Sequence, residues 1–444
     1  MELEGKRVVV AGMERSGVAA CALLAARGAR ILATDLKPLA QLPKAAAVLP
    51  ALGVPFARQT PEVFAAAELI VLSPGVPADL PPLAEARARG VPVWGEVELA
   101  GRFLRGPNIG ITGSNGKTTT TALTGHLLAH AGIPARVGGN IGEPVCALVD
   151  SSRPDQWNVL ELSSFQLETI ETFRCQLGAC LNVTPDHLDR HGTFAAYAAA
   201  KARLFATQRP EDVAVLNAAD ETCRAYASLA AGRTCWFQAA PARAGAWLEN
   251  GVLWLEGRRL MAASEIPLRG GHNVENVLAA ALLASLAGAP LEAIAAGVRS
   301  FRAVEHRLEF VRRVRGVDYF NDSKATNVDA ARKSIDAFDG GLWIILGGKD
   351  KDSDYTPLGE PLRRKAKAAL LIGAASAKIA AQLEPYTALL ETGTLEDAVR
   401  VAAASAAPGD TVLLAPACAS FDQFENFEHR GRLFKQLVHA LEET

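Results

Sequence analysis

Residues 109–121 bring together the groups that proteins use to hold the phosphates of a nucleotide. An apolar run ends in a polar loop, and a helix is expected to follow over residues 119–131. The loop and the first turn consist of Gly113, Ser114, Asn115, Gly116, Lys117, Thr118 and Thr119. Glycines let backbone N–H groups turn toward an anion, a lysine reaches the outer phosphates, and a threonine hydroxyl can bind Mg²⁺. Fewer residues separate the glycines than in the usual motif, yet the pattern predicts a loop that binds a nucleoside triphosphate.

Two further apolar strands lead into side chains that can bind metals. Glu161 lies near the end of one strand, and His187 lies in a loop with a second histidine and two acids after another. In a parallel sheet the carboxyl ends of strands face the ligand, and phosphate-loop enzymes commonly place a Mg²⁺-binding acid there. Lys201 lies on a helix expected over residues 195–205. The alternatives are a glutamate that caps the next helix, a solvated histidine and an exposed lysine.

The C-terminal third of the chain has polar segments at strand ends. Asn273 and Asn276 open an alanine-rich helix before it, on one helical face, where they either reach a nucleotide base or ribose or cap the helix. Strands then alternate with helices, which predicts another α/β domain. The expected strands are residues 317–321, 342–346, 368–372 and 411–415, and the final helix runs from about 423 to 441. Three of the strands end in polar loops, residues 321–327, 347–352 and 416–423, which suggests one shared crevice.

The first 96 residues are predicted to form a Rossmann-like βαβ unit. Strands are expected at residues 7–11, 29–34 and 69–72, with a turn at 12–17 and a helix at 18–27. Asp35 stands where such folds place a ribose-binding carboxylate, but Glu14 replaces the glycine that lets the backbone approach a pyrophosphate. Three interpretations therefore remain: a dinucleotide such as NAD, another diphosphate ligand, or a purely structural turn.

Length and composition indicate a multidomain α/β protein. The 444 residues exceed what one hydrophobic core organises, and short strands predominate over residues 212–267, as in a sheet-rich flank. We expect a Rossmann-like domain at residues 1–96, a central P-loop mononucleotide-binding domain at 97–302 and a C-terminal Rossmann-like domain at 303–444. The formal net charge of −2 gives no indication of a nucleic-acid partner.

Cysteine usage and hydropathy favour a cytoplasmic protein without a membrane partner. The seven cysteines are scattered and contain no Cys-x-x-Cys pair, so reduced thiols are expected. The first residues lack the basic-then-apolar pattern of a signal segment. The longest apolar run, residues 277–291, contains Pro290 and is shorter than the roughly 20 residues of a membrane span, so it is expected to be a buried helix.

Segments along the whole chain resemble the Mur ligase family, and most closely its D-glutamate-adding branch. In this resemblance, the phosphate loop and the pair His306-Arg307 match the family as a whole. Residues 162–167, 321–327 and 417–420 resemble that branch specifically, and residues 138–142, 182–189 and 272–276 add to the match. The resemblance implies an ATP-dependent, monomeric ligase that joins D-glutamate to UDP-N-acetylmuramoyl-L-alanine through an acyl phosphate.

The resemblance also implies binding roles in each domain. The uridine diphosphate end of the substrate would contact Arg15, Ser16, Asp35, Ser73, Pro74 and Gly75, with Asn140 from the central domain. ATP would be held by the loop Gly113 to Thr119 together with Asn273, Asn276, Arg307 and Asp322. D-Glutamate would contact His187, Thr326, Lys351, Ser420, Phe421 and Phe427.

For catalysis, the resemblance implies two Mg²⁺ ions and a modified lysine. The catalytic residues would be Lys117, Glu161, His187 and Lys201. Thr118 and Glu161 would bind one ion, and His187 and Lys201 would serve the second. Lys201 would carry a carbamate formed with CO₂, which turns a cation into the anionic oxygen ligand that a hard metal prefers.

Departures from the family pattern and rival functions stay open at this point. The roles within Lys349-Asp350-Lys351 are unassigned, because the familiar relatives have a different loop there, and Glu14 weakens the diphosphate assignment. A folylpolyglutamate-type or other Mur-type ligase would share the central chemistry. A nucleotide-binding regulator without chemistry and a P-loop kinase are the remaining alternatives.

Overall fold

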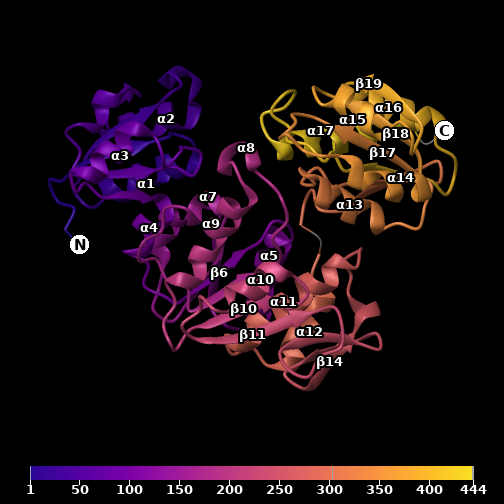
Figure 1. Cartoon of the computed structure of the whole chain (residues 1–444), viewed down its shortest axis with the longest axis horizontal. Helices are drawn as coiled ribbons and strands as arrows, with labels where there is room; N and C mark the ends of the chain where they lie inside the picture. Colours follow the sequence, from indigo (N-terminus) through magenta and orange to yellow (C-terminus); the bar gives the residue numbers. More distant parts are fainter. Residues whose placement is uncertain (1, 303, 443–444) are drawn as a thin grey trace.

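The computed structural model describes residues 2–302 and 304–442 and contains three β-sheets packed against helices (Figure 1). The sheets form three lobes that follow one another along the chain, coloured indigo, magenta and orange to yellow in Figure 1. The predicted three-part α/β architecture is confirmed. Residue 303, expected to begin the C-terminal domain, and the chain ends 1 and 444 lie outside the described residues.

The N-terminal lobe is a five-stranded parallel sheet in the order β3-β2-β1-β4-β5. Its strands are β1 (Arg7–Ala11), β2 (Arg30–Asp35), β3 (Phe56–Arg58), β4 (Leu69–Leu72) and β5 (Val93–Gly95). Its helices are α1 (Arg15–Ala25), α2 (Pro43–Ala51) and α3 (Pro81–Ala88), with 3₁₀ turns at Leu39–Gln41 and Pro61–Phe64. The central strand β1 is buried from Val8 to Ala11, as expected for a parallel strand covered on both faces. Helix α1 therefore begins at the sheet edge where β1 ends.

The central lobe is a nine-stranded sheet in the order β14-β13-β12-β11-β10-β9-β6-β8-β7. Its strands are β6 (Asn108–Thr112), β7 (Ala135–Gly139), β8 (Trp157–Glu161), β9 (Leu177–Cys180), β10 (Val213–Asn217), β11 (Arg233–Gln238), β12 (Ala246–Glu249), β13 (Val252–Leu255) and β14 (Arg258–Ala262). Seven strands pair in parallel, and β13 and β14 extend the sheet as antiparallel strands, which accounts for the short strands predicted over residues 212–267.

Helices surround this sheet and connect it to the N-terminal lobe. They are α4 (Glu96–Gly101), α5 (Lys117–His130), α6 (Val145–Leu148), α7 (Ser164–Leu167), α8 (Leu188–His191), α9 (Phe194–Ala206), α10 (Glu221–Tyr226), α11 (His272–Leu286) and α12 (Leu291–Ser300), with 3₁₀ turns at Val149–Ser151 and Ala263–Glu265. The single helix expected over residues 277–291 is wrong in extent. Helix α11 ends at Leu286, and Pro290 is the N-cap of α12, because proline cannot continue a helix.

The C-terminal lobe is a six-stranded sheet in the order β15-β16-β20-β17-β18-β19, parallel except for the β15–β16 pair. Its strands are β15 (Glu309–Val314), β16 (Val317–Asn321), β17 (Leu342–Gly347), β18 (Ala366–Ile372), β19 (Leu389–Gly393) and β20 (Thr411–Leu414). Its helices are α13 (Val328–Asp336), α14 (Gly359–Lys365), α15 (Ser376–Leu383), α16 (Leu395–Ser405) and α17 (Phe427–His439), with a 3₁₀ turn at Thr356–Leu358. The expected start of the last helix near residue 423 is wrong, because Asn426 caps α17 by accepting the His429 N–H.

The hydrophobic cores connect the lobes unequally. One core contains Leu24 of α1, Val97 of α4, Leu148 of α6 and Leu204 of α9, so it runs from the N-terminal lobe into one face of the central sheet. The two large cores of the C-terminal lobe contain buried residues only from Leu308 onward. Apolar side chains thus join the first two lobes, whereas the third has an interior of its own.

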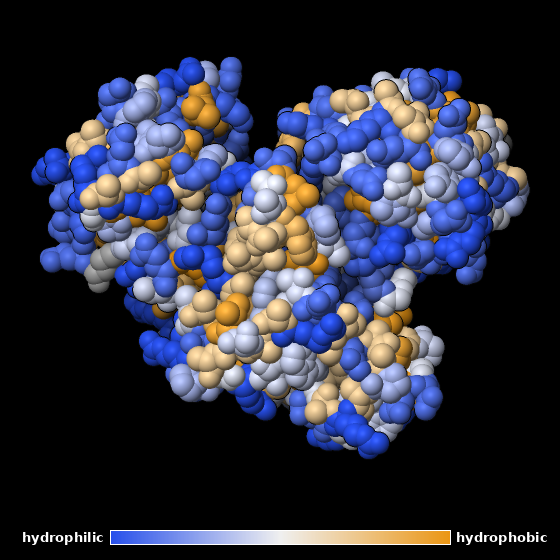
Figure 2. All heavy atoms as spheres, viewed as in Figure 1, coloured by the Kyte–Doolittle hydropathy of each residue, from blue (hydrophilic) through white to orange (hydrophobic). Residues whose placement is uncertain are grey.

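The surface agrees with this arrangement. Figure 2 shows two largely hydrophilic outer lobes with a notch between them, and more apolar atoms gather in the middle, where Figure 1 places α7, α8 and α9. Phe194 at the start of α9 is one of the exposed large apolar side chains. Among the described residues, no helix has both the length and the apolar character needed to cross a bilayer.

Helix α4 joins the N-terminal and central lobes through two buried carboxyl groups. Glu96 Oε1 accepts the Cys146 N–H of α6 at 2.6 Å. Glu98 accepts the N–H groups of residues 171–173 and the Thr172 hydroxyl. Burial raises the pKa of Glu96 to about 7, against hydrogen bonds from Cys146 and Val145. Burial acts in the same direction on Glu98, but its hydrogen bonds outweigh burial and lower the pKa of that carboxyl.

These opposite shifts predict opposite effects of neutral substitutions. Folded Glu96 keeps a proton that the unfolded chain has lost, so it costs stability as pH rises from 4.5 to about 7. Glu96→Gln is therefore expected to gain up to about 3 kcal/mol relative to the wild type between about pH 5 and about pH 8. Denaturant unfolding of the variant and the wild type at the two pH values measures the difference in their free energies of unfolding. Glu98→Gln is the matched control. Its folded pKa is lowered, so the stabilisation by its carboxylate is already present at both pH values, and this variant should be less stable than the wild type by a similar amount at each. A gain in stability with rising pH in both variants would contradict the prediction.

Candidate active site

The phosphate loop has the backbone geometry that its glycines predict. Strand β6 leads into the loop and α5 starts at Lys117, with Gly113 and Gly116 at φ 149° and 86°. A side chain at Gly116 would collide with Asn276, since its Cβ would lie 2.2 Å from Asn276 Oδ1. Lys117 Nζ bends back to donate to Gly113 O at 2.8 Å and Ser114 O at 3.0 Å. Because α5 begins directly after the loop, its first N–H groups lie beside the loop, which suits an anion.

A pocket beside this loop gathers most of the residues predicted for ATP. Asn273 Nδ2 donates to Arg269 O, and Asn276 Nδ2 donates to Asn273 Oδ1, so the pair braces the start of α11 as well as facing the pocket. The predicted residues that line the pocket are Asn115, Gly116, Thr119, Asn273, Asn276, Arg307 and Asp322. Three other polar residues in its wall were not predicted from the sequence: His272, Lys333 and Ser334.

Arg307 and Asp322 contribute buried polar atoms to this pocket that have no hydrogen-bond partner. These atoms are Arg307 Nε and Asp322 Oδ1. The other carboxylate oxygen of Asp322 accepts the Ser334 hydroxyl, and burial raises the Asp322 pKa. Buried polar atoms without partners are rare in proteins because they are costly, so they indicate a polar ligand. These atoms suit a nucleotide.

Two side chains of the central lobe have oxygens that fit a metal ion. Thr118 Oγ1 and Glu161 Oε2 are both buried without a hydrogen-bond partner, while Asn140 Nδ2 donates to the other oxygen, Glu161 Oε1, at 2.6 Å. Hydroxyl and carboxylate oxygens are the ligands that Mg²⁺ prefers. Ser163, and not Glu161, caps α7, so the alternative of a helix-capping glutamate is wrong. The two unpartnered oxygens suit a Mg²⁺ ligand set.

His187 and Lys201 are held close to the loop but in different ways. Lys201 is buried and donates from Nζ to Gly113 O at 2.9 Å, so the alternative of an exposed lysine is wrong. Burial and the charge of Lys117 lower the pKa of Lys201 to about 7. His187 has φ 54° and packs its ring on Phe165 at 4.9 Å between centroids. Burial lowers the His187 pKa to about 4 although Asp186 raises it, so the ring is neutral and can bind a metal.

In the N-terminal lobe, side chains at the carboxyl ends of β2 and β4 hydrogen-bond to the turn between β1 and α1. Asp35 Oδ2 accepts the Met13 N–H at 2.7 Å, and the Ser73 hydroxyl donates to Gly12 O at 2.6 Å. These bonds fix the backbone of the turn at the start of α1. Glu14 points to solvent and pairs with Lys37, so its side chain does not fill the turn.

Of the residues predicted to bind the uridine diphosphate, two line a pocket where the three lobes meet. Arg15 comes from the N-terminal lobe and Asn140 from the central lobe, and Thr118 lies beside them. Asp35 and Ser73 stand outside this pocket, bonded to the turn. Ser16, Pro74 and Gly75 are likewise not part of its wall.

Lys324 completes this three-lobe pocket and was missed by the sequence analysis. Its ammonium lies 3.7 Å from the centroid of the Phe427 ring, which also lines the pocket. Burial lowers the Lys324 pKa to about 8, whereas Glu161 raises it. The signal was present, because Lys324 lies inside the polar loop 321–327 that follows β16.

The residues predicted for D-glutamate do not share one pocket in this structure. His187 and Lys351 line a cavity between the central and C-terminal lobes, and Lys351 Nζ lies 3.1 Å from Asp186 Oδ1. Phe427 lines the three-lobe pocket. Ser420 is buried, Phe421 is exposed, and neither they nor Thr326 line those two cavities. Asp186, which bonds Lys351, was not predicted.

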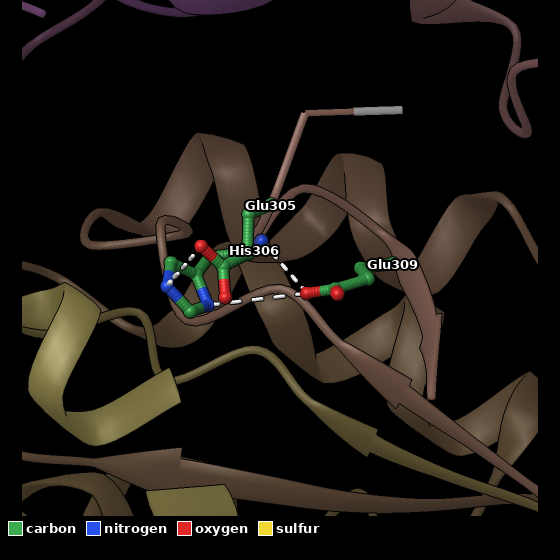
Figure 3. A group of neighbouring side chains, drawn as sticks. All are labelled: Glu305, His306 and Glu309. Carbon is green, nitrogen blue, oxygen red and sulfur yellow. Dashed lines mark hydrogen bonds and ion pairs between the residues drawn. The ribbon is translucent and has the colours of Figure 1, made fainter. Parts of the chain in front are cut away.

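A separate cluster of ionisable groups, Glu305, His306 and Glu309, lies at the start of β15 (Figure 3). The backbone N–H of His306 donates to Glu309 Oε2 at 3.0 Å, and the ring atom His306 Nδ1 lies 2.8 Å from Asn321 Nδ2. Lys435 Nζ lies 3.1 Å from Glu305 and 2.6 Å from Glu309. Because this ammonium already pairs with both carboxylates, we interpret the cluster as an ion-pair network that anchors the chain next to Arg307.

Each of the three lobes matches a known protein-family model. Three family models match the chain: "Mur ligase MurD-like, N-terminal domain" over residues 6–95, "Mur ligase middle domain" over 111–284 and "Mur ligase, glutamate ligase domain" over 306–418. Each match falls on one of the three sheets.

Relatives match over the full length. A UDP-N-acetylmuramoylalanine–D-glutamate ligase from Solibacter usitatus is 62% identical, covering 100% of this chain and 99% of its own. The ligase of the same name from Acidobacterium capsulatum is 51% identical, covering 99% and 97%.

Solved structures share the fold at lower identity. UDP-N-acetylmuramate-alanine ligase MurC from Thermotoga maritima is 19% identical with a TM-score of 0.64, covering 98% of this chain and 99% of its own. MurF ligase from the same organism, solved in complex with ADP, is 16% identical with a TM-score of 0.61, covering 92% and 95%.

Proposed function

Because this chain belongs to the Mur ligase family, we propose that it joins D-glutamate to UDP-N-acetylmuramoyl-L-alanine at the expense of ATP, a step in making peptidoglycan precursors. Members of the family are ATP-dependent, and the full-length relatives carry the name of this reaction. We further propose that the division into residues 1–96, 97–302 and 303–444 separates the sites for the uridine substrate, ATP and the amino acid. The enzyme is proposed to act as a monomer in the cytoplasm.

The observation that carries the proposal is the convergence of unpartnered polar atoms beside the phosphate loop. Thr118 Oγ1 and Glu161 Oε2 are buried without partners, and the pocket at Thr118 is also lined by Arg15, Asn140 and Lys324 from three lobes. A ligase that activates a carboxylate with ATP needs this arrangement, because the triphosphate, the acid and the amine must meet at one point.

The reaction is proposed to run in three steps. A terminal carboxylate oxygen of the L-alanyl group attacks the γ-phosphorus of ATP and the bond to ADP breaks, giving an acyl phosphate. The deprotonated amine of D-glutamate then adds to the acyl carbon. The tetrahedral intermediate expels phosphate and leaves the amide. Activation is required because a free carboxylate is a poor electrophile.

Residues of this chain are proposed to supply charge and orientation for these steps. Lys117 and Lys324 offset the negative charge of the phosphates and of the substrate carboxylate. Thr118 and Glu161 would hold one Mg²⁺, and His187 and Lys201 would hold the other. Such ions would offset the charge of the phosphates and polarise the phosphoryl oxygens. Arg15 and Asn140 orient the substrate from the N-terminal side.

Lys201 is proposed to carry a carbamate. A carbamate forms when a neutral amine adds to CO₂ and loses a proton, and the buried Lys201 amine has a pKa lowered to about 7. We expect enzyme equilibrated with ¹³C-bicarbonate to show a carbamate signal by NMR that is lost in Lys201→Arg, and CO₂-depleted enzyme to regain activity when bicarbonate is added. Lys44→Ala, at an exposed lysine of α2, is the control. An identical signal in Lys201→Arg would contradict the assignment.

For the acceptor, we propose that D-glutamate contacts His187, Thr326, Lys351, Ser420, Phe421 and Phe427. Lysine ammonium and serine hydroxyl groups suit the two carboxylates of the amino acid. Five of these residues lie on the C-terminal lobe and His187 lies on the central lobe, so closure of the C-terminal lobe is proposed to bring the five toward His187 and the phosphate loop.

One experiment tests the proposed function and separates it from its rivals. ADP and phosphate release is measured with UDP-N-acetylmuramoyl-L-alanine and, in turn, D-glutamate, L-glutamate or meso-diaminopimelate. Release that depends on D-glutamate supports the proposal. Preference for another acceptor would indicate a sibling ligase, ADP without phosphate a kinase, and no release a regulator.

A further inference from the structure

The C-terminal lobe must be held in place by polar contacts, because it shares no large hydrophobic core with the rest of the described chain. One such contact lies near the connection, where the Arg269 guanidinium stacks 5.0 Å from the Phe320 ring centroid. The others lie at the phosphate loop and at the loop that carries His187. The contacts at both loops involve residues at the N-terminus of α13.

The first contact joins the phosphate loop directly to α13. Asn115 Nδ2 donates to Asp329 Oδ2 at 2.7 Å. The Asn115 backbone is fixed from both sides by Asn182, which accepts its N–H at 2.8 Å and donates to its C=O at 3.1 Å. The position of Asn115 is therefore fixed relative to the phosphate loop, so a shift of the loop also moves Asn115 Nδ2, which bonds Asp329.

The second contact uses the residue that caps α13. Asn327 Oδ1 accepts the Ala330 N–H, so this side chain is committed to the helix N-terminus. Its Nδ2 donates to Asp186 Oδ2 at 2.9 Å, and the other oxygen of Asp186 pairs with Lys351. Asn115, Asn327 and the Asp186 carboxylate are nearly buried, so water competes little for these bonds.

We propose that Asp329 and Asn327 are positioning residues that dock the C-terminal lobe onto the phosphate loop, so that the state of the loop and the closure of the amino-acid site are coupled. The inference rests on the proposed function, since it names how the proposed D-glutamate residues are brought to the phosphates. Coupling of this kind is reciprocal, so occupation of the loop biases closure and closure biases the loop.

An intrahelical role alone would not give this coupling. Asp329 also pairs with Arg332 and Lys333 of its own helix, at 3.2 Å and 3.0 Å. Asp397 of α16 offers the same local features, because it lies in a first turn and pairs with Arg400 three residues later. The hydrogen bonds of Asp397 within the described part of the chain go to Thr394 and Arg400 of its own lobe, which makes it the matched control.

The test compares Asp329→Ala with Asp397→Ala in the full-length protein. We expect Asp329→Ala to have a larger radius of gyration by small-angle X-ray scattering, to bind ADP without the compaction that ADP causes in the wild type, and to raise the KM for D-glutamate about tenfold, which is about 1.4 kcal/mol. The KM for the uridine substrate should stay within about twofold, since Arg15 and Asn140 are untouched. Asp329→Asn retains an oxygen that can accept from Asn115 and should restore both values.

Other outcomes overturn the proposal in distinct ways. Equal scattering and equal KM values in the two alanine variants would show that Asp329 acts only within α13. If Asp329→Ala fails to fold, Asp329→Thr, which suits a first helical turn but is too short to reach Asn115, replaces it. If the wild type releases no phosphate with any acceptor, the proposed function fails, but the scattering comparison still decides whether the lobe is docked by Asp329.

Discussion

Lys117→Ala is expected to lower turnover by about 10³-fold, the upper range for removing one preorganised charge from a reacting site. Lys117 begins α5 inside the phosphate loop, and its ammonium lies against the carbonyl oxygens of Gly113 and Ser114. From that position it can turn outward to the phosphates, where charge moves during transfer. Steady-state phosphate release with saturating substrates measures the loss.

The loss must arise from chemistry rather than from unfolding. Lys117→Met retains most of the apolar stem, and its melting temperature should remain near that of the wild type. Lys44→Ala, at an exposed lysine of α2, should leave turnover unchanged. Near-normal turnover in Lys117→Ala would refute the assignment of the loop as the site of phosphoryl transfer.

Glu161→Gln is expected to lower turnover by about 10²-fold and to raise the Mg²⁺ concentration that gives half-maximal activity. The amide oxygen can still accept from Asn140, but an NH₂ group would stand where Glu161 Oε2 is now buried without a partner. An amide NH₂ repels a cation, so the change removes a metal ligand while conserving shape. Calorimetric titration of Mg²⁺ in the presence of ADP gives a readout independent of turnover.

Glu143→Gln is the matched control for that variant. Glu143 lies in the same loop as Asn140, but its carboxylate is mostly exposed and pairs with Arg136. Metal affinity and turnover should match the wild type. A Glu161→Gln enzyme with unaltered Mg²⁺ dependence would show that the orphaned carboxylate oxygen serves another purpose.

Local signals predicted the elements that carry the chemistry. The glycines of the phosphate loop require positive φ, the apolar runs around it are buried strands, and the polar loops follow those strands, so β6, β8 and β16 fell where expected. The pocket with Asn273, Arg307 and Asp322 also joins residues that the family resemblance had grouped.

Contacts between lobes could not be predicted in the same way. Lys324 and Asp186 lie in polar loops that were singled out from the sequence, but they acquire their environments from groups distant in the sequence, Glu161 and Lys351 respectively, which the loops alone did not indicate. Helix ends were also misplaced, because side-chain caps such as Asn426 decide them. The buried state of Lys201 depends on Gly113, 88 residues away, and its helix alone favoured an exposed lysine.

The separate interior of the C-terminal lobe has a bearing on how such enzymes diversify. Substitutions that reshape that lobe around a new amino acid need not be compensated inside the other two lobes, which share a hydrophobic core with each other but not with it. Selection can therefore alter which amine is accepted while the machinery for activating the acid stays intact, provided that the few polar contacts at α13 survive.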